Sequence, residues 1–149
     1  MKRSDSLDMV QQHAARTERE RAERVGAAER HLVEMQQKLA ALERYRGEYE
    51  SGFASRVGAG TDVIGMRDFQ TFLARLGEAI TQQREVVSLA QGVLDAERSN
   101  WREAAQRAHV VDTLAERWHS EESRAADRRD QQESDELSSQ RATAKERNP

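Results

Sequence analysis

Large apolar residues recur along the chain at alternating spacings of four and three, in two separate stripes. A repeat of about 3.5 residues is typical of helices that pack in a left-handed coiled coil. Only Arg46 interrupts the first stripe, and its methylene stem can cover an apolar seam while the guanidinium reaches water. The first stripe reads Val25, Ala28, Leu32, Met35, Leu39, Leu42, Arg46, Tyr49, Phe53. The second reads Phe69, Leu73, Leu76, Ile80, Gln83, Val87, Ala90, Leu94, Glu97, Trp101, Ala104, Ala108, Val111, Ala115, Trp118.

Glycine is concentrated between the two stripes, at Gly52, Gly58, Gly60 and Gly65. Glycine ends helices and adopts the positive φ angles that turns require. We therefore predict an all-α fold with helices at about residues 5–54 and 66–140 and a turn at about residues 56–65. A single helix would leave its apolar stripe in water, so residues 1–149 are expected to form one antiparallel coiled-coil hairpin.

The two stripes also predict which residues face each other, because the residue numbers of facing positions in such a hairpin have a near-constant sum. This rule pairs Leu39 with Ile80 and Tyr49 with Phe69. It sets Arg21 opposite Glu97, either as an ion pair that fixes the register or with both side chains directed to solvent. The expected seam residues are Val25, Leu32, Leu39, Leu42, Tyr49, Phe53, Phe69, Leu73, Ile80, Val87, Leu94 and Trp101.

The second helix is expected to extend past the first as a polar overhang. After Trp118 the only large apolar residue is Leu137, in "HSEESRAADRRDQQESDELSSQRATAKERNP". A lone polar helix is marginal in water, so the tail to residue 149 is expected to fray unless a partner binds it.

Composition and charge limit the possible partners. The 24 basic and 27 acidic residues are finely mixed, as in "ERERAERVGAAER", which is typical of a solvated helix face and not of a nucleic-acid-binding stripe. Cysteine is absent, which excludes disulfides and thiolate metal sites. The sequence has no secretory signal pattern and no apolar run of membrane-spanning length, so we expect a soluble cytoplasmic protein without direct membrane insertion.

No pattern of catalytic residues stands out. Glu116 and His119 have the Glu-x-x-His spacing of di-iron bundles, but those sites need the motif twice, so a surface histidine is the simpler interpretation. The glycines of "GAGTDVIG" follow no strand and precede no lysine, so they fit a turn better than a phosphate loop. We expect no enzyme activity, no cofactor and no metal.

Packing between two helices does not by itself account for the apolar residues at two places in the sequence. Phe72 lies beside Phe69, so the apolar face near the turn is unusually wide. This face either wraps around the aromatic end of the hairpin or forms an exposed docking surface. Trp118 lies near the open end, where it either packs on the seam or contacts another protein.

The order and spacing of several segments resemble the FliJ family of the bacterial flagellar export apparatus. These segments are "YRGEYESGF", "FQTFLARLGEAITQQ", "SNWREAAQR" and "DRRDQQESDEL". The resemblance implies a small export chaperone that is also the stalk of the export ATPase, with a fold similar to the long helices of the rotary ATPase γ subunit. It implies a protein that joins the ring of the hexameric flagellar export ATPase to the cytoplasmic domain of the export gate, at the inner membrane. Other export chaperones are further possible partners.

The same resemblance implies two contact surfaces. The surface toward the export gate would consist of Phe72, Leu76, Ala79 and Gln83, the last at a position where family members can have histidine. The open end would enter the ATPase ring and contact it through Trp118, Arg128, Arg129 and Leu137. A rival hypothesis is a generic structural coiled coil that self-associates as a dimer of hairpins.

Overall fold

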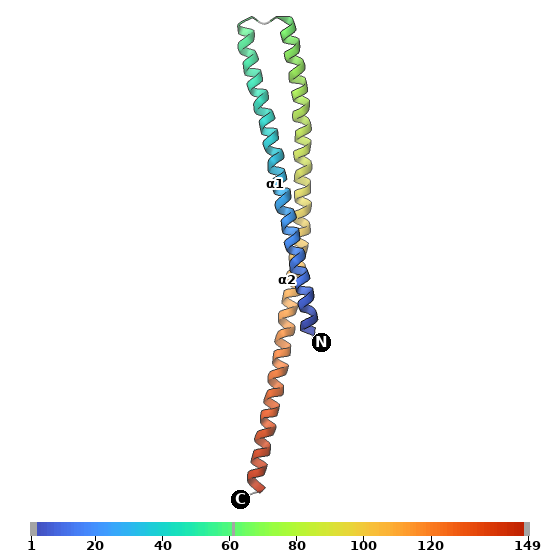
Figure 1. Cartoon of the computed structure of the whole chain (residues 1–149), viewed down its shortest axis with the longest axis vertical. Coiled ribbons are helices and arrows are strands. Elements are labelled where there is room, and N and C mark those ends of the chain that lie inside the picture. The colour runs from blue at the N-terminus through green and yellow to red at the C-terminus, as the bar shows by residue number, and fades with distance from the viewer. Residues whose placement is uncertain (1–2, 61, 148–149) are drawn as a thin grey trace. The chain divides into compact units, whose positions relative to one another are not determined.

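The computed structural model describes residues 3–60 and 62–147. Two helices, α1 (Arg3–Gly58) and α2 (Val63–Arg147), account for the described secondary structure, which contains no strand. They pack against each other as a hairpin (Figure 1), and α2 is the longer helix. The predicted all-α hairpin is confirmed.

The turn is tighter than the glycine pattern suggests, because α1 continues to Gly58 and α2 begins at Val63. Among the described residues, only Gly60 has a positive φ angle, of 89°. The amide of Gly60 donates to the carbonyl of Val57 at 3.2 Å, which closes the last turn of α1. One glycine is thus sufficient to reverse the chain, and the glycines before it are tolerated inside the helix. Residue 61 of the expected turn lies outside the described residues.

Asp62 precedes the second helix and caps it. Its carboxylate accepts a hydrogen bond of 2.8 Å from the amide of Gly65, and its carbonyl accepts one of 3.2 Å from Met66. This is the geometry of an aspartate N-cap, which satisfies an otherwise unpaired amide of the first turn. The cap explains why α2 starts ahead of its first seam residue, Phe69.

At its other end α2 extends to Arg147, past the expected end near residue 140. Hydrogen bonds within one turn occur along this part of the helix. The hydroxyl of Thr143 donates to the carbonyl of Ser139 at 2.9 Å, and the amide of Gln131 donates to the carboxylate of Asp135 at 3.2 Å. Both bonds lie within α2 itself, and the side chains of residues 126–147 are exposed. Residues 148 and 149 of the expected tail lie outside the described part.

The chain divides into two compact units. The first, here called the hairpin unit, is Arg19–Glu103 and contains the turn. Within it the two helices lie side by side and run in opposite directions (Figure 1). Its core is a cluster of buried residues with Val25 and Val87 packed against it: Ala28, Leu32, Met35, Ala90 and Leu94. Every predicted seam residue is buried or partly buried.

The second, here called the terminal unit, combines Met1–Glu18 with Ala104–Pro149. Its buried apolar residues are Leu7, Ala14, Ala104 and Ala115. The amide of Gln11 donates to the carboxylate of Asp112 at 2.7 Å, which joins the beginning of α1 to α2. Small residues dominate this core, so it buries less apolar area than the core of the hairpin unit.

The predicted alternative of an ion pair between Arg21 and Glu97 is wrong. Arg21 and Glu97 are both partly buried, and no ion pair between them occurs in the described structure. The Oε2 atom of Glu97 is instead buried without a hydrogen-bond partner. Holding the long Arg21 side chain against Glu97 would cost side-chain entropy and desolvate the guanidinium as well, and an ion pair at a partly exposed seam returns little of that cost.

Neither helix, over the residues described, contains a stretch apolar and long enough to cross a membrane.

Candidate functional site

Five aromatic side chains gather at the turn end of the hairpin unit. We call them the aromatic cluster: Tyr45, Tyr49, Phe53, Phe69 and Phe72. Phe69 stacks on Phe53 with ring centroids 3.5 Å apart and on Tyr49 with centroids 5.0 Å apart. The spacing of four residues on α1 aligns its three rings along one face, and α2 inserts Phe69 against two of them.

Phe72 extends this cluster away from the main seam. The centroid of its ring lies 4.3 Å from that of Tyr49 and 6.1 Å from that of Tyr45, and the rings of Phe72 and Tyr45 are nearly perpendicular. Phe72 is partly buried, whereas Tyr45 is 50% exposed. The wide apolar face near the turn therefore wraps around the hairpin and still presents aromatic surface to solvent.

The other three residues of the predicted gate surface lie on the next turns of α2. Leu76 is only 7% exposed, and Ala79 and Gln83 are partly buried. The side-chain amide of Gln83 bonds to the carbonyl of Met35 across the seam. Phe72 and Ala79 thus keep part of their surface in contact with solvent, whereas Leu76 is buried and Gln83 is bonded across the seam.

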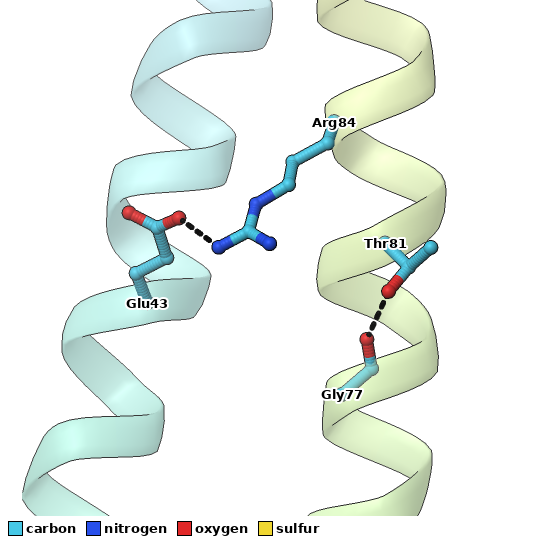
Figure 2. A network of polar contacts seen from close by, with 4 residues as sticks. All are labelled: Glu43, Gly77, Thr81 and Arg84. Carbon is cyan, nitrogen blue, oxygen red and sulfur yellow. Dashed lines mark hydrogen bonds and ion pairs between the residues drawn. The ribbon is translucent and has the colours of Figure 1, made fainter.

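Charged side chains link the helices along the outside of the seam. Arg84 donates to the carboxylate of Glu43 at 3.1 Å, as Figure 2 shows, and Arg98 reaches Glu29 at 3.4 Å. Figure 2 also shows the hydroxyl of Thr81 bonded to the carbonyl of Gly77 one turn earlier in α2. These ion pairs are exposed to solvent, so each adds less than about 1 kcal/mol and mainly favours one register.

A groove opens beside the aromatic cluster, with a volume of about 350 Å³. Phe53 and Phe69 form part of its wall, and Glu48 and Asp68 contribute a carboxylate from each helix. Gly52 also lines it, and a Cβ atom placed there meets no atom within 4 Å. The groove therefore combines apolar walls, acidic groups and unfilled space.

The predicted ring-contact residues belong to the terminal unit. Trp118 is partly buried, with the guanidinium carbon of Arg3 5.5 Å from the centre of its ring, which is a cation–π distance. Arg128, Arg129 and Leu137 are exposed on the part of α2 that follows. The tryptophan thus packs within the unit, and the other three side chains face solvent.

The histidine of the Glu-x-x-His motif lies against a carboxylate of the other helix. His119 lies 3.1 Å from the carboxylate of Asp8, and its side chain is exposed. Over the described residues, no three histidine or carboxylate side chains gather closely enough to hold a metal ion.

Sequence reasoning missed two features of the site. Tyr45 belongs to the exposed aromatic surface, and its spacing of four from Tyr49 already indicated a shared helix face. The groove had no comparable signal, because Glu48 and Asp68 are ordinary surface residues until the hairpin register places them beside it.

The family model that describes the flagellar FliJ protein matches residues 2–147. The chain belongs to this family. A flagellar FliJ protein of Escherichia coli (strain K12) is 30% identical over 121 residues, which cover 81% of this chain and 82% of that protein. A flagellar FliJ protein of Salmonella typhi is 26% identical over 145 residues, which cover 97% of this chain and 99% of the relative. No solved structure matches the chain significantly.

Proposed function

We propose that this FliJ-family chain is a non-enzymatic component of the flagellar protein export apparatus. It acts as the stalk of the hexameric export ATPase, couples that ring to the export gate, and has chaperone-type roles toward other export chaperones. It works in the cytoplasm, at the periphery of the inner-membrane export apparatus. The observation that carries the proposal is an aromatic cluster with the half-exposed ring of Tyr45 at its edge, on a two-helix hairpin of a flagellar family.

The aromatic cluster is the proposed contact with the gate. Exposed apolar side chains follow it at the turn, namely Val57, Val63, Ile64 and Met66. Single exposed apolar residues are normal on protein surfaces, whereas exposed apolar residues gathered at one place are typical of an interaction site. Phe72 and Ala79 make the contact in this proposal, and Leu76 and Gln83 keep them in position from inside the hairpin.

The terminal unit provides the proposed contact with the ATPase ring. After Trp118, α2 continues as a helix whose side chains are nearly all exposed, including Arg128, Arg129 and Leu137. A helix without an internal partner gains stability when another protein covers it. This supports entry of the terminal unit into the ring.

Such a stalk performs no chemistry of its own. It can change the ATPase only by binding some conformations of the ring more tightly than others. The same differential contacts would couple ring and gate, since binding at one site changes affinity at the other by a reciprocal factor.

One observation favours the rival, a structural coiled coil that self-associates. Val86, Leu89 and Val93 form a second apolar stripe on α2, and all three are exposed. Their spacing of three and four fits a further helix packed on this face. Light scattering at micromolar concentration distinguishes the two: a monomer supports the stalk, and a stable dimer supports the rival.

The decisive experiment measures turnover of the export ATPase and binding of the gate's cytoplasmic domain, with and without this protein. We expect stimulation of the ATPase and saturable gate binding by the wild-type chain. If the protein neither stimulated the ATPase nor bound the ring or the gate, the proposal would be wrong. The Phe72→Asp variant should abolish gate binding while helicity, measured by circular dichroism, stays unchanged. Val33→Asp, at an exposed position of α1, is the matched control and should bind normally.

A further inference from the structure

The groove beside the aromatic cluster carries two carboxylates without partners. Glu48 and Asp68 are exposed, and within the described residues neither forms a hydrogen bond or an ion pair. They line the same groove from opposite helices. Each carboxylate thus keeps its full capacity to accept hydrogen bonds from an incoming group.

The groove has room for a side chain that the protein itself does not supply. Its volume is about 350 Å³, and glycine occupies two lining positions, Gly52 and Gly65. At Gly52 no atom lies within 4 Å of where a Cβ would be. A long side chain at Gly52 would occupy space that the glycine leaves open.

We propose that this groove binds a lysine or arginine side chain of the export gate. The inference rests on the proposed function and specifies the chemistry of the gate contact. Lysine and arginine combine an apolar stem with a cationic end, and they bury the stem along apolar surface while the charge reaches polar groups. The stem lies along Phe53 and Phe69, and the cation is held by Glu48 and Asp68.

Charge selects this occupant over others. An acidic side chain would be repelled by both carboxylates, and a purely apolar one would leave them desolvated without a hydrogen-bond donor. Arg56 also lines the groove and has an interaction of its own within the protein. With Arg56 counted, the charged residues of the lining keep a net charge of −1, and an incoming arginine would engage Glu48 and Asp68 with its forked donors.

The test measures the affinity of the full-length protein for the gate's cytoplasmic domain by isothermal titration calorimetry. The double variant E48Q/D68N removes both charges with little change in shape. We expect it to weaken binding about tenfold at low salt and to reduce the salt dependence of the affinity. The control E34Q/E85Q removes one exposed, unpaired carboxylate from each helix away from the groove, and it should bind as the wild type does.

A second variant tests the space rather than the charge. Gly52→Leu fills the groove without altering charge, and it should weaken gate binding to a similar extent. Gly47→Leu, in the same helix with open space around it, should have no effect. Absence of gate binding by the wild-type chain overturns both this inference and the proposed function. Normal binding by the wild type, E48Q/D68N and Gly52→Leu overturns the groove assignment alone.

Discussion

The side-chain amide of Gln83 donates a hydrogen bond of 3.0 Å to the main-chain carbonyl of Met35. The same nitrogen lies 3.6 Å from the sulfur of Met35. A polar residue at a seam position therefore joins the two helices of the hairpin unit directly. Because Gln83 also falls on the predicted gate surface, its role in stability and its role in binding can be separated by mutation.

Gln83→Ala should lower the free energy of unfolding by about 1 kcal/mol, the typical net contribution of one hydrogen bond. Urea denaturation followed by circular dichroism measures this change. Gln82→Ala is the control, since Gln82 is exposed and the change in helix propensity is the same. Gate binding by Gln83→Ala should stay close to that of the wild type, and a large loss of affinity at unchanged stability would show that Gln83 contacts the gate directly.

Ile80→Ala should destabilise the protein more than Leu89→Ala, although both variants truncate a large apolar residue of α2. Ile80 is 1% exposed, whereas Leu89 is 71% exposed. Removing a buried isoleucine side chain costs about 2–5 kcal/mol, because transfer free energy is lost and a cavity forms. Leu89→Ala should change stability by less than about 0.5 kcal/mol. Equal denaturation midpoints for the two variants would contradict the register of the hairpin.

The sequence carried most of the information about the hairpin. Apolar spacing of four and three requires helices with one buried face, and glycine between the stripes requires a reversal. The facing positions follow from these two facts alone, and Tyr49 indeed stacks on Phe69. The burial of a whole helix face involves many side chains, so no single residue decides whether the hairpin forms.

Details that depend on one side chain were harder to predict. Arg21 and Glu97 face each other in the pattern, yet the choice between an ion pair and separate side chains depends on desolvation. The length of the turn depends on the cap at Asp62 and on the conformation of Gly60, not on the number of glycines. The groove lies between two helices, so its lining residues share no pattern in either helix alone.

Gly60→Ala should destabilise the hairpin, and Gly58→Ala should not. Of these two glycines, only Gly60 has a positive φ, where a Cβ atom is strained, although neither has an atom within 4 Å of an added Cβ. The left-handed conformation costs a non-glycine residue about 1–2 kcal/mol. Gly58 ends α1 with ordinary helical geometry, so alanine there should be neutral or stabilising. Thermal unfolding of the two variants tests this, and equal midpoints would contradict the turn geometry.

Glu97→Leu should stabilise the hairpin unit, even though it removes a charged residue. The Oε2 atom of Glu97 is buried without a hydrogen-bond partner, and such an atom costs about 1–3 kcal/mol in desolvation. Leucine at this seam position replaces the unsatisfied oxygen with apolar contacts, so the urea midpoint should rise. Glu85→Leu, at an exposed position of the same helix, controls for helix propensity and for the loss of charge. A midpoint for Glu97→Leu at or below that of Glu85→Leu would show that water or a neighbouring group already satisfies the Glu97 carboxylate in solution.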